Sequence, residues 1–518
     1  MASNEGRKEV HPAGESGKVS LERSAEHPGA VDTFGGKVFV RWDSEAAVTA
    51  FGPVTYFIEF LKTNGLWQQW VEDCPLSYRS PNAPPKADIL GTILLGVLAG
   101  HKRYAHITTI RSDSVTPALL GMQRVRSEDA VRRAFRQGEA VDYEQWLQRH
   151  LEMSYEELLG ESWILDMDAT VKPLYGHQEK AVRGYNPAKP GRPSQVYQSY
   201  FIAAIRMVLE GEVQAGNQAA SKHAQPGLWN WLERRPREQW PELIRGDLAW
   251  GTDRMMEECE QRGLAYLFKL KQTTKVKRHI EKLFRRADWV AAGGRWEGLS
   301  SELQLTGWSR SRRVVVLRRQ VRESLALVDT DETTAQGILF ATAELTQTGE
   351  LYEYAVLVTS LEEEVLGIAQ LYRDRAEAEN VLDELKNQWG WTGFTTHDHQ
   401  RCQILARIVA LIYNWWSLFT RLAIPNRHTE ATTSRPLLLH GIARQTRHGK
   451  QTTLTITSSH AQAKAIRGAL EAVSQLLQRL RQTAEQLTSR QRWRLLLRFI
   501  FRDWLKDQPA EPLFLPSE

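Results

Sequence analysis

The chain has 518 residues, a length that corresponds to about two to four domains and excludes a single ordinary core. Hydrophobic residues make up 42% and charged residues 25%, the balance of a soluble globular protein, and no apolar run approaches the roughly 18 to 20 residues of a membrane span. The net charge of +5 weakly favours a polyanionic partner, while three widely separated cysteines exclude a disulfide framework and predict a reduced, cytoplasmic location.

The first part of the chain divides into a tail and a helical region. Residues 1–45 are rich in Gly, Glu, Lys and Ser, and we expect most of them to be flexible. Residues 46–155 follow a helical pattern, with an apolar run near residues 89–100. Ser127 has the character of an N-cap before another helix-period run.

The pattern changes at residues 163–168, which predict a short buried strand, followed by a long loop rich in Pro and Gly. The next expected elements are a hairpin turning at Glu210-Gly211, a helix at 228–234, a strand at 243–247, a helix capped by Thr252 or Asp253, and a strand at 265–270. This order predicts a mixed α/β sheet over residues 156–270.

The remaining chain divides into three further regions. Residues 271–360 are strand-rich and predict an inserted β-rich subdomain. The pattern then predicts helices almost to the end of the chain, over 361–425 and a basic region at 426–518. We expect the last helices to serve subunit contacts, DNA binding, or both.

Three acidic residues have positions that suit chemistry. Asp168 and Asp247 end two predicted strands, and Glu379 lies within a predicted helix at 368–388. Strand ends of an α/β sheet gather side chains at one edge, where carboxylates can hold Mg²⁺. Taken singly, an Asp at a strand end is more often a turn former or a helix cap.

The predicted helix at 368–388 carries polar residues along one side. Tyr372, Arg375, Glu379 and Lys386 fall within an arc of about 60° beside an apolar stripe. A carboxylate between Arg and Lys suits a metal ligand next to phosphate contacts. An ordinary salt-bridged helix explains the same spacing, and geometry alone leaves both interpretations open.

These residues resemble a known family. The segment Tyr372-Arg-Asp-Arg-Ala-Glu-Ala-Glu-Asn-Val-Leu-Asp-Glu-Leu-Lys386 resembles the Y-(2)-R-(3)-E-(6)-K signature of DDE transposases of the insertion-sequence-four superfamily. The segments Leu165-Asp-Met-Asp-Ala-Thr170 and Ile244-Arg-Gly-Asp247 resemble its two Asp blocks. The segments Tyr175-Gly-His-Gln-Glu179 and Gly184-Tyr-Asn-Pro-Ala-Lys-Pro-Gly-Arg-Pro193 resemble the thirteen-eighty branch of that superfamily.

The resemblance implies an RNase H-like catalytic core with a β-rich insertion between the second Asp and the Glu. It implies that Asp168, Asp247 and Glu379 bind metal, as two Mg²⁺ ions for which Mn²⁺ can substitute. Tyr372, Arg375 and Lys386 would then contact the DNA backbone. The implied partners are the terminal inverted repeats of a mobile element and its target DNA, which a homodimer would bind. The implied location is the bacterial nucleoid and not a membrane. Residues 46–155 would read the sequence of the repeats.

The sequence departs from the family pattern in both Asp blocks. Ala169 replaces one of two hydroxyl residues after Asp168, and the residues after Asp247 are not the usual Ser-Gly. Asp166 is an alternative first ligand, because it lies two residues from Asp168 and so on the same strand face. Asp253 is the alternative second ligand, although it suits a helix cap better.

Three other residues have two open interpretations each. Lys189 and Arg192 lie in the Pro/Gly loop, where they either reach phosphates or are solvated. Trp308 lies in the expected insertion and either receives an unstacked base, as in related enzymes, or packs in the core.

The sequence thus predicts a metal-dependent transposase that cuts DNA at the ends of a mobile element and joins the 3′-hydroxyl ends to a target. Two alternatives stay open: an RNase H-like nuclease without strand transfer, and a catalytically inactive DNA-binding protein descended from a transposase.

Overall fold

The structure is a computed structural model that describes residues 29–502, apart from 79, 137, 219, 321–343, 346–350, 426–427, 458 and 484–485. It divides into two compact units, Met1–Ala46 and Ala47–Glu518. In the first unit, β1 (Ala30–Thr33) and β2 (Gly36–Phe39) form an exposed antiparallel hairpin that the composition did not predict. The rest of the expected flexible tail, residues 1–28, lies outside the described residues.

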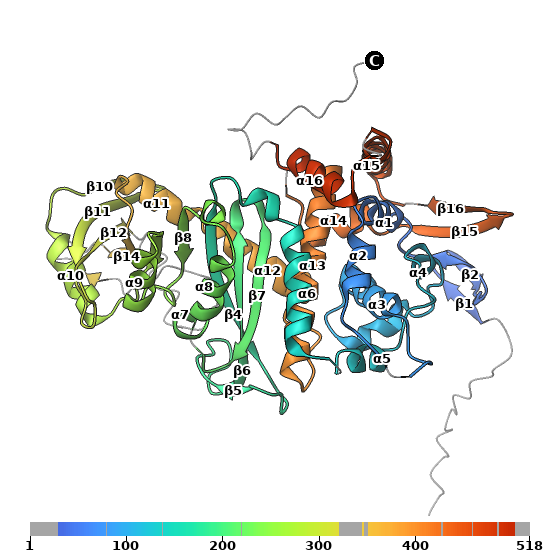
Figure 1. Ribbon diagram of the computed structural model, residues 1–518, viewed down its shortest axis with the longest axis horizontal. Helices are drawn as coiled ribbons and strands as arrows, with labels where there is room; N and C mark the ends of the chain where they lie inside the picture. Colours follow the sequence, from blue (N-terminus) through green and yellow to red (C-terminus); the bar gives the residue numbers. More distant parts are fainter. Residues whose placement is uncertain are drawn as a thin grey trace, which may run out of the picture. The chain divides into compact units, whose positions relative to one another are not determined.

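The second unit is built on a large mixed sheet, which has eleven strands among the described residues (Figure 1). The strand order is β10-β11-β12-β14-β9-β8-β4-β6-β5, with β7 also on β6 and β13 on β14. The strands are β4 (Ile164–Pro173), β5 (Val182–Arg183), β6 (Pro193–Ile202), β7 (Met207–Ala215), β8 (Leu243–Gly246), β9 (Ala265–Lys269), β10 (Val290–Gly293), β11 (Trp296–Leu303), β12 (Arg312–Gln320), β13 (Glu344–Leu345) and β14 (Leu351–Thr359). The predicted mixed α/β sheet is confirmed.

The centre of the sheet consists of three parallel strands. β4 pairs with β8 and β8 with β9 in parallel, while β6 and β7 continue the sheet in antiparallel order. These central strands are short apolar runs that are buried, which is the pattern of parallel strands covered on both faces. The strands predicted near 163–168, 243–247 and 265–270 are confirmed.

The hairpin of β6 and β7 turns at a different place from the predicted one. The turn lies at the short 3-10 helix Ala203–Ile205 and at Arg206, which has a φ of 50°. Gly211 lies inside β7, where a Cβ would approach the Trp391 ring to 3.1 Å. The prediction of a turn at Glu210-Gly211 was wrong because this glycine makes room for a tryptophan from a distant helix end.

The strands at 290–359 do not form a sheet of their own. β14 pairs with β9, so β10 to β14 extend the central sheet and cover an edge that would otherwise expose unpaired backbone groups. The helices between the strands are α7 (Ala220–His223), α8 (Gln225–Glu233), α9 (Asp253–Gln261) and α10 (Thr274–Phe284). Thr252 caps α9 by accepting a hydrogen bond from the Met255 amide.

Helices from both ends of the second unit pack together beside β7, which α6 and α13 contact directly (Figure 1). They are α1 (Val54–Thr63), α2 (Leu66–Asp73), α3 (Lys86–Leu98), α4 (Val115–Leu119), α5 (Glu128–Ala134), α6 (Ala140–Met153), α13 (His399–Ala423), α14 (Ala431–Leu438), α15 (Ala463–Thr483) and α16 (Ser489–Ile500). Two further helices pack on the sheet, α11 (Val365–Arg373) on β10, β11 and β12 and α12 (Ala376–Asn387) on β4. Ser127 caps α5, as predicted. By length and composition α13 could cross a membrane, but 94% of its most apolar window is buried inside the protein, as in a core helix.

The C-terminal region is not helical throughout, contrary to the prediction. β15 (Ile442–His448) and β16 (Gln451–Thr457) form a hairpin between α14 and α15. The base of the hairpin pairs with β3 (Val48–Thr49), which lies at the start of the second unit. The alternating Thr, Leu and Ile of β16 favour a strand, because β-branched side chains suit a pleated surface.

Candidate active site

Charged residues lie where the parallel pairing of β4, β8 and β9 ends. The prediction that Asp168 ends its strand was wrong, because β4 continues to Pro173 in its antiparallel pairing with β6. Met167, Gly246 and Phe268 lie opposite one another in the paired β4, β8 and β9. The next residue of each strand is therefore Asp168, Asp247 or Lys269, in a row across the sheet edge. Neighbouring strands are about 4.8 Å apart, so these side chains are within reach of one another.

Asp168 is a buried carboxylate with competing neighbours. Its residue is 8% exposed, its Oδ1 accepts the Ala169 amide at 2.8 Å, and its Oδ2 accepts from Arg375 at 2.9 Å. Burial raises the pKa of the Asp168 carboxyl to about 6; the Arg375 charge lowers it, and the charges of Asp247 and Glu379 raise it further. The site therefore holds more negative charge than it neutralises.

The helix predicted at 368–388 is two helices. α11 ends at Arg373 and α12 begins at Ala376, with Asp374 and Arg375 forming a tight turn between them. α11 packs on β10, β11 and β12, whereas α12 packs on β4 and on the β6–β7 turn. The prediction of one continuous helix was wrong, because the two helices follow different parts of the sheet, but Tyr372 still lies near Arg375 and Glu379.

Arg375 connects two of the three predicted acids. Its Nη2 lies 2.9 Å from Asp168 Oδ2 and its Nη1 lies 2.8 Å from Glu379 Oε1. The guanidinium is only 3% exposed, while the Glu379 side chain is 53% exposed. The salt bridge between Arg375 and Glu379 is thus the i,i+4 pair expected of an ordinary helix, but the same Arg375 also pairs with Asp168 of β4.

Asp247 and Glu379 keep free oxygen atoms in the described structure. Asp247 is half-buried, and its Oδ1 accepts the Ala249 amide at 2.9 Å. Hard carboxylate oxygens and uncompensated negative charge fit a divalent cation in chemical type. In this arrangement, however, no three acidic, His or Cys side chains of the described residues converge closely enough to hold one.

Asp166, the alternative first ligand, is used differently. It is fully buried, and its two oxygens accept from Arg245 Nε at 2.8 Å and Nη2 at 2.7 Å. Arg245 also donates to the backbone of Leu371 in α11. Asp166 thus belongs to a buried ion pair that ties β4, β8 and α11 together, whereas Asp168 faces the acid cluster.

Tyr372 and Lys269 adjoin the acid cluster, and Lys386 lies elsewhere on α12. Tyr372 packs on the apolar cluster beneath α11, and burial raises the pKa of its hydroxyl. Burial lowers the pKa of Lys269 more than the charges of Glu379 and Asp247 raise it. We did not select Lys269 from the sequence, although its place at the end of the strand after Asp247 could have identified it. Lys386 is exposed near the end of α12.

The other predicted contact residues lie in separate places. Lys189 and Arg192 are exposed in the loop after β5, where Arg192 lies over the Tyr175 ring at 4.4 Å. Trp308 is partly buried against the main core with Arg312 over its ring at 5.5 Å. Asp253, the alternative second ligand, forms an ion pair with Arg312 at 2.6 Å.

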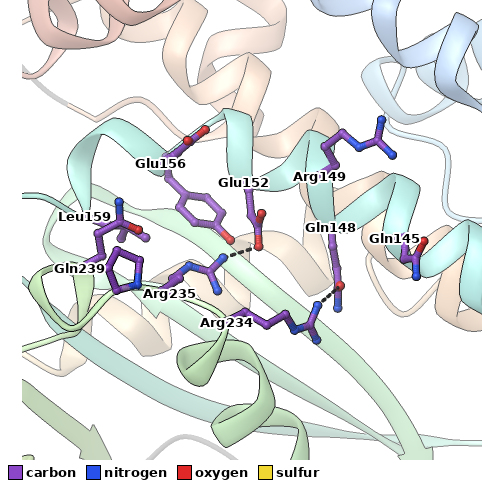
Figure 2. Close-up of a pocket in the computed structure, with 11 residues that line it drawn as sticks. Gln145, Gln148, Arg149, Glu152, Glu156, Leu159, Arg234, Arg235 and Gln239 are labelled. Carbon is purple, nitrogen blue, oxygen red and sulfur yellow. Dashed lines mark hydrogen bonds and ion pairs between the residues drawn. The ribbon is translucent and has the colours of Figure 1, made fainter.

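A cavity of about 450 Å³ lies outside the acid cluster. Figure 2 shows its lining side chains, which come from α6 and from the segment after α8. Arg234 donates to Gln148 at 2.7 Å, and Arg235 forms an ion pair with Glu152. Positive and negative groups compensate each other here, and none of the predicted site residues lines this cavity.

Comparison with known proteins identifies the family. No curated protein matches the chain closely enough to count as a relative. A similar solved structure is the piggyBac transposase synaptic complex with hairpin DNA, seen by cryo-electron microscopy, with 10% identity, coverage of 90% of this chain and 87% of that chain, and a TM-score of 0.37. That score does not establish a common fold. The sequence model of the family described as transposase DDE domain group 1 matches residues 78–478, more than half of the chain, and the chain therefore belongs to the DDE transposase domain group 1 family.

Proposed function

We propose that this chain is the transposase of a mobile DNA element, which cuts DNA at the terminal inverted repeats and joins the resulting 3′-hydroxyl ends to target DNA. One observation carries the proposal. Asp168 and Asp247 follow paired residues of adjacent parallel strands, and Arg375 links Glu379 of α12 to Asp168. Acids from three distant parts of the sequence are thus carried by neighbouring elements in a member of a DDE family, which supports the proposal.

The strand order supports an RNase H-like core. β7-β6-β4-β8-β9 has two antiparallel strands followed by three parallel ones, with Asp168 inside the first parallel strand and Asp247 directly after the second. We propose that α10 and β10 to β14 are the insertion between Asp247 and Glu379. The order of Tyr372, Arg375, Glu379 and Lys386 supports the insertion-sequence-four superfamily and its thirteen-eighty branch.

The acid cluster is the proposed metal site. Asp168, Asp247 and Glu379 would hold two Mg²⁺ ions, or Mn²⁺ in their place, which would polarise the attacked phosphate and activate the attacking oxygen. Holding them requires Glu379 to leave Arg375, whose guanidinium now neutralises both Glu379 and Asp168. Arg375 is then free to donate to a phosphate oxygen, which it suits as a planar donor fork.

Other residues of the site would position the DNA. Lys269 places a cation at the end of β9, beside the acids, where it can offset phosphate charge. We propose that Tyr372 and Lys386 contact the backbone near the cut, with Lys189, Arg192 and Trp308 as further contacts. We also propose that a homodimer binds the duplex DNA and that residues 46–155 read the terminal repeats. The proposed location is cytoplasmic and nucleoid-associated.

The test is cleavage and strand transfer on DNA that carries the element's own inverted repeats, with Mg²⁺. Wild type should cut and join, whereas Asp168→Ala, Asp247→Ala and Glu379→Ala should bind the DNA and do neither. Cutting without joining would favour the nuclease alternative. A wild type that binds the ends and is inert would favour the inactive DNA-binding alternative.

A further inference from the structure

The hairpin of β15 and β16 has an unusual charge for so exposed an element. Between Glu430 and Glu471 the sequence contains no Asp or Glu. The hairpin carries Arg444, Arg447 and Lys450, and none of these three forms an ion pair or a side-chain hydrogen bond within the described part of the chain. Their charges are therefore available to a partner.

The base of the hairpin is anchored while its outer part is free. β15 pairs with β3 at Ala443 and Arg444, and Ala443 is completely buried. From Thr446 to Thr453 every residue is exposed. Figure 1 shows the two strands projecting past α14 and α1 as a ribbon. The tip closes through Gly449, whose φ of 59° suits the first central residue of a two-residue hairpin turn.

The pairing register places polar groups on both faces of the hairpin. Residues directly opposite in an antiparallel pair share a face, so Arg444 lies beside Thr455, and Thr446 beside Thr453. The other face carries the buried Ala443 at the base, opposite Ile456, and the exposed Arg447 farther out, opposite Thr452. Hydroxyl and guanidinium donors thus line both faces of the outer ribbon, and such donors suit phosphate oxygens.

We infer that this ribbon is a second DNA-binding element, which holds duplex DNA through its phosphates. Seven residues per strand span about 23 Å at about 3.3 Å per residue, and a two-stranded ribbon fits the B-DNA major groove. Charge complementarity selects the partner, because the ribbon is purely basic and DNA is a polyanion. The inference rests on the proposed function only in taking that polyanion to be DNA.

The test measures how salt weakens the binding of full-length protein to a labelled 30-base-pair duplex of unrelated sequence, by fluorescence anisotropy without metal. Each phosphate contact contributes about 0.9 to the slope of log K against log salt. Arg444→Gln/Arg447→Gln/Lys450→Gln should therefore lower the slope by about 2.7 and weaken binding about 100-fold at 0.15 M salt. Because the three side chains are exposed, the melting temperature should stay unchanged.

Two control variants separate the ribbon from charge in general. Lys222→Gln/Arg254→Gln/Arg285→Gln removes the same charge from exposed positions outside the ribbon and outside residues 46–155, and should change the slope by less than about 1. Arg444→Lys/Arg447→Lys keeps the charge and should keep the slope.

The inference would be overturned if the ribbon variant and wild type had equal salt slopes. It would also be overturned if the ribbon variant and the control variant with three charges removed elsewhere lost equal amounts of slope. A ribbon variant that changes the oligomeric state in light scattering but not the DNA slope would assign the ribbon to a second copy of the chain instead. A ribbon-dependent slope in a protein that neither cuts nor joins would retain the inference and reject the proposed function.

Discussion

The buried pair of Asp166 and Arg245 permits a test of which aspartate serves the chemistry. Both side chains are at most 3% exposed, and two hydrogen bonds of 2.8 and 2.7 Å join them. Removing one partner of such a pair leaves an uncompensated buried charge and costs about 3–5 kcal/mol. We expect Asp166→Ala to lower the melting temperature by about 6–15 °C, at about 2–3 °C per kcal/mol for a large domain.

A double variant separates the pair from its surroundings. Asp166→Leu/Arg245→Met removes both charges, so it should recover most of the stability that Asp166→Ala loses. Asp168→Asn should behave differently, because Arg375 keeps its ion pair with Glu379 and the pKa of the buried Asp168 carboxyl is raised to about 6, so its ionised form is already unfavourable in the folded protein. It should keep or raise the melting temperature and abolish cleavage.

The assay combines thermal unfolding with cleavage at a temperature where all variants are folded. If Asp166→Ala keeps its stability but loses cleavage, while Asp168→Asn stays active, the assignment of the two residues is reversed and the reasoning is refuted. If both variants are destabilised equally, Asp168 is a structural residue as well.

Three further outcomes are expected. Chelation of divalent ions with EDTA should abolish cleavage, and added Mn²⁺ should restore it, without a change in metal-free DNA binding; activity in EDTA would contradict the metal site. Lys269→Met should slow cleavage about 10-fold or more, whereas Lys269→Arg should cleave at close to the wild-type rate, because the site requires a cation beside the acids. Equal cleavage rates for the two variants would refute this. Burial, aided by the Glu210 charge, raises the pKa of Glu212 from 4.5 to about 7. The ionised form therefore costs stability as pH rises from about 4.5 through 7, and Glu212→Gln should stabilise the protein by about 1–2 kcal/mol at pH 8 and not at pH 4, after a discount for partial exposure. Thermal unfolding at the two pH values measures this difference, and an equal gain at both would exclude ionisation as its cause.

Local sequence was sufficient for the strands that carry the two aspartates. β8, β9 and the first part of β4 contain closely spaced apolar residues that are buried, and such short apolar segments predict buried strands. The same local reasoning identified Asp168 and Asp247 as residues at one sheet edge. For Glu379 the spacing of Tyr372, Arg375, Glu379 and Lys386 left a metal ligand and an ordinary salt-bridged helix open, and the resemblance to the transposase signature implied the metal ligand.

Only the tertiary structure decided how these residues are used. The break between α11 and α12, the glycine inside β7 and the position of Lys269 each depend on a segment that is far away in the sequence. The choice between Asp166 and Asp168, which share a strand face, depends on which arginine lies beside each carboxylate: Arg245 pairs with Asp166, and Arg375 with Asp168. Sequence periodicity reports which side of an element is buried, whereas pairing between charges is decided by the neighbours that folding brings to that side.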